Sequence, residues 1–331
     1  MKIIQAKAEQ ICEKDPYKKV ELAARTCYKS ESKITEDSAV RMCKGLIKSQ
    51  HTAMLEHAVL CFELLPADPS MPNHMDARDQ YMGYLAKYPY LHVTANPIID
   101  LEANTCKTRI LASGNLRAIS ERGVNDPIFR ATQEQYPNLV WGKAATDTYH
   151  IYPEVVARIV NIDDLDDLTL DEIGEHKALT FRFTTNRGVS HELVRHRPCS
   201  FAQESTRYCL YSKDQFNSEL TFIQPADWDE WSVSKQHAHL AFLQVVEQHY
   251  LELVSGEDAL KAQQARDDLT NGVKTEIVTT ANMKEWKHIF NLRAYGTTGA
   301  PHPDIKFVMG QALYIAMQDP IAARYLEASN G

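Results

Sequence analysis

The chain has 331 residues, 44% of them hydrophobic, and a formal net charge of −8 at pH 7, which predicts a globular protein with a large buried core. A sequence pI near 5.9 argues against a nucleic-acid binder, because such binding depends on neutralising many phosphates. No apolar run has membrane-spanning length, the N-terminal segment lacks the apolar centre of a signal peptide, and seven cysteines form no CxxC pair, so reduced thiols and a cytoplasmic location are expected.

The first third of the chain predicts two helices and a strand. Apolar residues recur at helical spacing in residues 18–28 and 37–50. The segment EHAVLCFELL, residues 56–65, then alternates in the period of a half-buried strand. His57 is expected at the beginning of that strand.

Over a hundred residues separate this strand from the next alternating segment, ALTFRFTT at 178–185. Between them, residues 106–119 suggest a strand, a turn and a helix. The acidic run at 161–175 is interpreted as a solvated connection rather than a metal site. Its carboxylates have no histidine or cysteine nearby and no glycine in the position that an EF-hand requires.

The second alternating strand turns at NRG into VSHELVRHR, residues 189–197, which predicts a helix with Ser190 as a plausible N-cap. Pro198 disfavours helical geometry at Arg197. The helix is therefore expected to end there, and residues 198–205 to form a loop.

Four further helices are predicted in the C-terminal third, at residues 232–255, 259–269, 276–293 and 304–318. On the third of them, Asn282, Trp286, Ile289 and Arg293 share one face, because steps of three and four residues return to the same side of a helix. A polar group therefore stands at each end of an apolar stripe.

The segment RHRPCSFAQESTRY, residues 195–208, concentrates three arginines and a histidine in an acidic chain. Arginine holds phosphate or carboxylate through a planar, bidentate fork, so an anion site is the first interpretation. The alternative is a basic surface whose charges are paired by Glu192 and Glu204.

Several common site types have no support in the sequence. No GxGxxG or GxxxxGK[ST] motif is present, so side chains must hold any phosphate, and no GxSxG or HExxH motif is present. His51, Glu56 and His57 have no special geometry on an extended segment, and no metal is expected. Cys199 could be a thiol of lowered pKa, but a small buried filler is favoured.

The 195–208 segment resembles the signature of the flavin-dependent thymidylate synthases, which runs Arg-His-Arg, two residues, Ser, four residues, Ser, one residue, Arg. The matching positions are Arg195, His196, Arg197, Ser200, Ser205 and Arg207. Other segments resemble the family in the expected order: AARTCYKS, HTAMLEHAVLCFEL, the Ala-Arg pair at 265–266, and NMKEWKHIFNLR followed by APHPDI. The resemblance covers residues 20–62 and 178–316.

This resemblance implies an α+β fold with a twisted antiparallel sheet and flanking helices. It also implies a homotetramer whose active sites lie between subunits. The whole chain, 1–331, is expected to form a single domain with a large insertion at about 66–177 between two core strands, as in a longer branch of the family found in bacteria and phages.

The activity implied by the resemblance is methylation of dUMP to dTMP, with methylenetetrahydrofolate giving the carbon and NADPH giving electrons through bound FAD. No nucleic-acid or membrane partner is implied. Contacts with the substrate are expected from Glu192, Gln203, Glu204, Ser205, Arg207, Arg266 and Arg293. Contacts with the flavin are expected from His57, Arg195, His196, Arg197, Asn282 and His288. Arg293, Ser205 and His57 are the expected catalytic residues, Ser205 by binding rather than by attack.

The chain departs from the family pattern at a few positions. Glu192 lies where the family often has Gln, Ala202-Gln203 where it often has Asn-Glu, Thr270 where it often has Pro, and His288 where it often has Asn. The alternative hypothesis is therefore a nucleotide-binding or regulatory paralogue with weak or no turnover. A third hypothesis, an RNA or polyphosphate binder, is disfavoured by the acidity of the chain.

Overall fold

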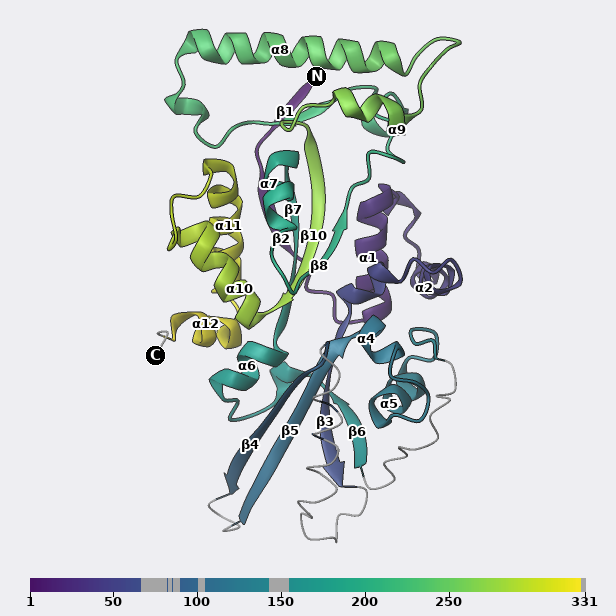
Figure 1. Ribbon diagram of the computed structural model, residues 1–331, viewed down its shortest axis with the longest axis vertical. Coiled ribbons are helices and arrows are strands. Elements are labelled where there is room, and N and C mark those ends of the chain that lie inside the picture. The colour runs from purple at the N-terminus through teal and green to yellow at the C-terminus, as the bar shows by residue number, and fades with distance from the viewer. Residues whose placement is uncertain (67–81, 83–84, 86–89, 101–104, 143–154, 329–331) are drawn as a thin grey trace.

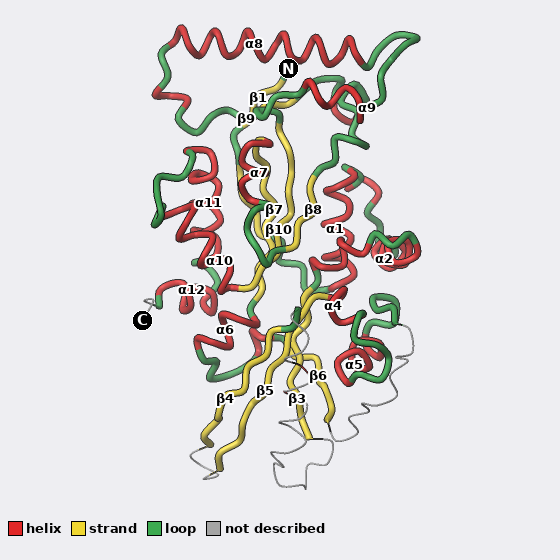
Figure 2. Tube along the Cα trace, viewed as in Figure 1, coloured by secondary structure: helices red, strands yellow, loops and turns green. Residues whose placement is uncertain are grey.

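The computed structural model describes residues 1–66, 82, 85, 90–100, 105–142 and 155–328. The molecule is elongated, with one long helix, α8 (Val233–Leu253), across one end (Figure 1). A central sheet with helices on both flanks follows, and a second sheet forms the opposite end (Figure 2). The two four-stranded sheets are antiparallel, which confirms the expected α+β class.

The central sheet has the strand order β2-β7-β10-β8. Its strands are β2 (Lys7–Gln10), β7 (Ala178–Asn186), β8 (Ser200–Gln203) and β10 (Lys274–Asn282). The predicted strand at 178–185 is confirmed. Two expectations are wrong: the helix predicted over 276–293 is a strand up to Asn282, and the loop predicted at 198–205 contains β8. Consecutive β-branched residues from Thr275 to Thr280, interrupted once by Glu276, favour the strand.

One face of the central sheet is covered by α10 (Met283–Phe290) and α11 (Pro303–Ala316), and α12 (Pro320–Glu327) packs against α10. Trp286 is fully buried there, and its ring meets Phe181 edge-on at 5.0 Å between centroids. Its indole nitrogen donates to the Leu179 carbonyl oxygen at 3.0 Å. The apolar stripe predicted between Asn282 and Arg293 therefore packs against β7.

The N-terminal helices lie on the other flank of the sheet (Figure 1). They are α1 (Pro16–Tyr28) and α2 (Ser38–Lys48), which confirms the two helices predicted at 18–28 and 37–50. Asp15 caps α1 by accepting from the Tyr17 N–H. His57 ends a 3-10 helix, Thr52–His57, and the following strand begins only at Val59, so the expected place of His57 on that strand is wrong.

The second sheet has the order β4-β5-β3-β6. Its strands are β3 (Val59–Pro66), β4 (His92–Asp100), β5 (Thr105–Asn115) and β6 (Val155–Val160), and the nearby helices are α4 (Leu116–Ser120), α5 (Pro127–Gln135) and α6 (Leu170–His176). The strand and helix predicted at 106–119 are confirmed by β5 and α4, but the turn predicted between them is wrong, because β5 runs directly into α4. The segment expected as an insertion, 66–177, thus supplies three strands that pair with each other or with β3, whereas β7 lies in the other sheet. The expected domain boundary stays a prediction.

The acidic run at 161–175 is not a fully solvated connection, so that interpretation is wrong in part. Glu172 on α6 is completely buried, and both of its carboxylate oxygens accept from Arg109 of β5, at 2.8 and 2.7 Å. Arg109 also donates to the backbone carbonyls of Asp166 and Asp167. This bidentate ion pair attaches α6 to the second sheet.

At the end of the molecule near α8, β1 (Lys2–Ile4) pairs in parallel with β9 (Thr221–Ile223). The helix predicted at 232–255 is α8, and the helix predicted at 259–269 is shorter, comprising α9 (Ala262–Ala265) and a 3-10 turn. Within the described ranges, no helix is long and apolar enough to cross a membrane.

Candidate active site

The segment 195–208 follows a short helix, α7 (Arg187–Leu193), which continues directly from β7. Asn186 caps this helix by accepting from the Val189 N–H at 2.8 Å, so the expected N-cap, Ser190, is wrong. The Ser190 hydroxyl instead donates to the Arg187 carbonyl. Because α7 ends at Leu193, Arg195 to Arg197 lie on the connection between α7 and β8.

The arginines of this segment are exposed and uncompensated. The side chains of Arg195 and Arg197 make no ion pair or hydrogen bond with any other described residue. The Arg207 guanidinium lies 5.7 Å from the centre of the Tyr208 ring and forms no ion pair within the described ranges. These three cations are thus free to receive an anion.

The alternative interpretation, that Glu192 and Glu204 neutralise these arginines, is wrong. Glu192 accepts from Arg293 at 2.7 Å. Glu204 is buried, accepts from the Tyr211 hydroxyl at 2.9 Å and pairs with Lys274 at 2.8 Å. The two carboxylates serve other partners.

His196 and Arg293 meet although they are 97 positions apart in the chain. The Arg293 Nε donates to His196 Nε2 at 3.1 Å, while its terminal nitrogen donates to Glu192. Arg293 lies on a π-helical turn, Asn291–Tyr295, that continues α10. Burial, with the neighbouring Arg293 and His288, lowers the pKa of His196 to about 4, so the ring is neutral at pH 7.

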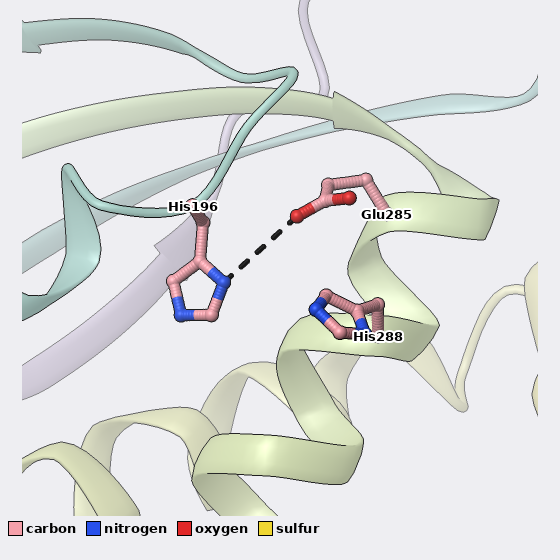
Figure 3. A group of neighbouring side chains, drawn as sticks. All are labelled: His196, Glu285 and His288. Carbon is pink, nitrogen blue, oxygen red and sulfur yellow. Dashed lines mark ion pairs between the residues drawn. The ribbon is translucent and has the colours of Figure 1, made fainter.

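The side chains of Glu285 and His288 on α10 lie beside His196 (Figure 3). The Glu285 Oε1 lies 3.9 Å from His196 Nδ1, and the His288 and His196 rings are 6.1 Å apart between centroids. Potential ligand atoms of these three residues lie within 4.8 Å of one another. Because His196 Nε2 accepts from Arg293, the proton of the neutral ring is on Nδ1, which leaves no lone pair there for a metal ion. The arrangement therefore suits proton and anion chemistry better than metal binding.

Sequence reasoning missed Glu285. Its signal was its spacing, three residues after Asn282 and three before His288, which places all three residues along one side of α10. Burial raises the pKa of Glu285 to about 7. A carboxyl group that titrates near neutrality next to two histidines is a mark of functional sites.

Asn282, predicted to line the flavin, caps α10 by accepting from the Glu285 N–H at 3.0 Å. Its amide nitrogen lies 3.4 Å from the Glu175 carbonyl oxygen. Glu175 is itself held by His92 and Lys284, and these hydrogen bonds lower its pKa to about 2. Asn282 therefore links α10 to α6, and its predicted contact with flavin stays a prediction.

His57 is wholly buried, and burial lowers its pKa to about 4. Its Nδ1 lies 2.9 Å from the Thr280 hydroxyl, while its Nε2 is a buried nitrogen without a described partner. In this conformation His57 does not reach the surface. Its predicted role toward the flavin stays a prediction.

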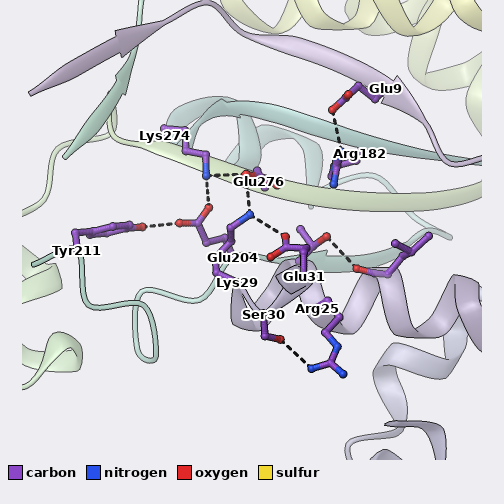
Figure 4. A network of polar contacts seen from close by, with 12 residues as sticks. Glu9, Arg25, Lys29, Ser30, Glu31, Arg182, Glu204, Tyr211, Lys274 and Glu276 are labelled. Carbon is purple, nitrogen blue, oxygen red and sulfur yellow. Dashed lines mark hydrogen bonds and ion pairs between the residues drawn. The ribbon is translucent and has the colours of Figure 1, made fainter. Parts of the chain in front are cut away.

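Gln203 and Glu204 both bond to other side chains of the same chain. Gln203 donates from its amide nitrogen to the Ser190 and Thr275 hydroxyls, at 2.9 and 3.1 Å. Glu204 belongs to a buried polar network in which Lys274 bridges two glutamates, Glu204 and Glu276 (Figure 4). A substrate contact by Glu204, which the resemblance implied, would have to replace this network.

The Ser205 hydroxyl accepts from the backbone N–H of Arg207 at 3.4 Å, and this local hydrogen bond links the two residues. Arg266 is separated from this group. It begins the 3-10 turn Arg266–Asp268, which follows α9 and contacts α8, and its exposed side chain lies 3.5 Å from that of its neighbour Asp267. One chain thus brings His196, Glu285, His288, Arg293 and Glu192 together but does not bring Arg266 to them.

Cys199 is partly buried against the central core, as the filler interpretation expected. Burial, together with the nearby Glu285, raises the pKa of its thiol well above the ordinary value. A thiolate nucleophile is therefore disfavoured at this position.

The exposed Arg195 and Arg197 thus flank His196, which Arg293 contacts from the turn that continues α10, so several cationic side chains gather at this place. Residues 157–318 match the family model described as "Thymidylate synthase complementing protein". The resemblance to the flavin-dependent thymidylate synthases is thereby confirmed.

Particular relatives carry the same name. The chain is 32% identical over 133 residues to the flavin-dependent thymidylate synthase of Geobacter sulfurreducens, covering 40% of this chain and 54% of the relative. It is 34% identical over 132 residues to that of Thermococcus onnurineus, covering 38% and 49%. The chain thus spans about half the length of the curated relatives it matches.

Two solved structures are also similar. The UMP/dUMP methylase PolB from Streptomyces cacaoi, bound with 5-Br dUMP, is 13% identical, with 98% of this chain and 96% of that chain covered and a TM-score of 0.39. Thymidylate synthase X from Helicobacter pylori, with FAD and dUMP, is 15% identical, with 46% and 74% covered and a TM-score of 0.33. Both TM-scores lie below 0.5, so the likeness to the family rests on the sequence matches alone.

Proposed function

We propose that this protein methylates dUMP to dTMP, with FAD as its bound cofactor, methylenetetrahydrofolate as carbon donor and NADPH as reductant. The family of residues 157–318 and the names of the relatives support this reaction. The observation that carries it is the set of exposed arginines at 195, 197 and 207, which no described carboxylate neutralises. Phosphate-bearing ligands require such cations where no glycine-rich phosphate loop exists.

The cofactor's phosphates fit Arg195 and Arg197, because both guanidinium groups are exposed and without a described partner. His196 and His288 would lie along the ring system, and FAD would supply the transfer of electrons from NADPH. The neutral His196 ring can donate or accept a hydrogen bond without adding charge. The chain's own contribution at this place is therefore binding and orientation.

The substrate's phosphate is assigned to Arg207, with Ser205 beside it and Arg266 and Arg293 as further cations. Arg293 is held by His196 and Glu192, so it is oriented before a ligand arrives. A preorganised guanidinium stabilises an oxygen on which negative charge develops. Arg293 is accordingly proposed as the catalytic cation, and Ser205 as a binding residue.

The site is proposed to be completed by other copies of the chain in a homotetramer. Arg266 belongs to the turn after α9, whereas Arg293 belongs to the turn after α10, and these two helices lie in separate parts of the molecule (Figure 1). His57 is also enclosed, so one chain does not present all of the proposed contacts together. In such an assembly, Arg266 of a second copy would lie next to Arg293 of the first copy.

The decisive experiment is an absorbance spectrum of the purified protein, before and after incubation with FAD. We expect a flavin band that is bleached by NADPH and dUMP without oxygen, and dTMP when methylenetetrahydrofolate is added. A protein that cannot be loaded with FAD would overturn the proposal. A protein that binds FAD and dUMP yet forms no dTMP would instead be the regulatory paralogue.

A further inference from the structure

Glu285 is a carboxylate with no described hydrogen-bond partner for its inner oxygen. Its Oε1 is buried and lies 3.9 Å from His196 Nδ1 (Figure 3). Burying a carboxylate oxygen without a hydrogen-bond partner is unfavourable for folding, so its presence points to a function. None of the residue roles proposed above involves the Glu285 carboxylate.

The hydrogen bonds of His196 indicate what Glu285 does. Arg293 has only donors, so the 3.1 Å contact from its Nε requires His196 Nε2 to be the acceptor. The neutral ring then carries its proton on Nδ1, and Nδ1 points toward Glu285. A carboxylate at that position stabilises this tautomer over the one with the proton on Nε2, in which two N–H groups would face each other.

We propose that Glu285 is a positioning residue that accepts the Nδ1–H of His196 and thereby keeps Nε2 available to orient Arg293. The order of contacts is Glu285, His196, Arg293 and Glu192, with the guanidinium held from two sides. This inference rests on the proposed function, in which the oriented Arg293 is the catalytic cation. At 3.9 Å the carboxylate attracts the Nδ1–H by its charge before any ligand is bound.

The groups around Glu285 agree with this role. His196 faces it from the α7–β8 connection, His288 lies one turn further along α10, and Cys199 is close enough for Glu285 to affect its pKa. Lys284, the adjacent cation, is paired with Glu175 and does not neutralise Glu285. With a pKa raised to about 7 by burial, the carboxyl group becomes the better acceptor as the pH rises through neutrality.

The first test reads the tautomer of His196 directly, by nitrogen NMR of imidazole-labelled protein without substrate. Wild type is expected to carry the proton on Nδ1. Glu285→Gln should keep that tautomer, since the amide oxygen still accepts, whereas Glu285→Leu should lose it. Glu230→Leu, the same change at an exposed glutamate, should leave it unaltered. A wild-type ring protonated on Nε2, or an unchanged tautomer in Glu285→Leu, would overturn the proposal.

A second measurement separates positioning from a merely structural role. Removing a buried, unpaired carboxylate should not lower the resistance of Glu285→Leu to urea. Its affinity for dUMP should nevertheless fall about tenfold or more, because a misdirected guanidinium loses its geometry. Glu285→Gln should recover most of the affinity. Lower stability with unchanged dUMP affinity would show a structural role only, which also overturns the proposal.

These readouts also distinguish the inference from the proposed function. If wild type binds neither dUMP nor FAD, the proposed function fails, while the NMR experiment still decides which nitrogen of His196 carries the proton. If wild type forms dTMP and Glu285→Leu does so at the same rate with the same dUMP affinity, only the inference fails.

Discussion

Arg207 is an exposed cation of the 195–208 segment with no ion-pair partner in the described ranges. If it holds the dUMP phosphate, Arg207→Ala removes a charge-assisted contact worth roughly 2–5 kcal/mol, so dUMP affinity should fall about 30-fold or more. FAD content should change much less, because Arg195 and Arg197 are assigned to the cofactor. Arg207→Lys should restore only part of the affinity, since an ammonium group lacks the planar fork.

The measurement for Arg207 is calorimetric titration of dUMP into the flavin-loaded variants. Arg324→Ala, which removes another exposed arginine from α12, is the matched control and should bind dUMP normally. Loss of flavin rather than dUMP in Arg207→Ala would show that this arginine serves the other ligand.

The thiol of Cys199 is not expected to be needed for the reaction. Its thiol has a raised pKa and fills a partly buried space, so Cys199→Ala should keep substantial dTMP formation per bound flavin. The rate is to be compared with wild type at equal flavin loading. Complete loss of activity in a folded, flavin-loaded variant would indicate a covalent role for the thiol.

At the scale of elements, His176 attaches α6 to the second sheet. Its two ring nitrogens lie 2.8 Å from the hydroxyls of Thr94 and Ser113, on β4 and β5. Burial lowers the pKa of His176 to about 4, below its ordinary value of 6.5, so the unfolded chain binds the proton more readily. The stability from the neutral ring is therefore complete above pH 6.5 and is lost as the pH falls toward 4.

The prediction concerns the free energy of unfolding measured with urea at pH 7 and pH 5. His176 should account for about 1–2 kcal/mol of the decrease between these values, and His176→Gln should show that much less pH dependence. His237→Gln, a change at an exposed histidine of α8, should match wild type. An equal pH dependence in His176→Gln would contradict the assigned cause.

Elements with a clear period were predictable, and those decided by tertiary contacts were not. The alternation at 178–185 predicted β7, and the helical spacing at 18–28 predicted α1. Residues 276–282 were misassigned because their apolar residues also fit a helical period, whereas pairing with β7 on one side and β8 on the other makes them a central strand. Glu285 was missed for a related reason: its burial beside His196 depends on a contact 89 positions away in the chain.

At the scale of the whole molecule, the predicted assembly is a homotetramer. Arg266 and Arg293 belong to separate regions of one chain, so full activity should require association. Sedimentation at several protein concentrations, combined with dTMP assays on each species, measures this. A monomer with full activity would contradict the composite site.

The ion pair between Glu192 and Arg293 has a consequence for ionic strength. Before any ligand arrives, Arg293 is already neutralised by a carboxylate at 2.7 Å. An incoming anion there meets a cation that Glu192 already compensates, whereas a phosphate at Arg207 meets a cation without an ion-pair partner in the described ranges. Added salt should therefore weaken contacts at Arg207 strongly and contacts at Arg293 little. Binding of a neutral nucleoside, which has no phosphate to place at Arg207, should therefore depend much less on salt than binding of dUMP.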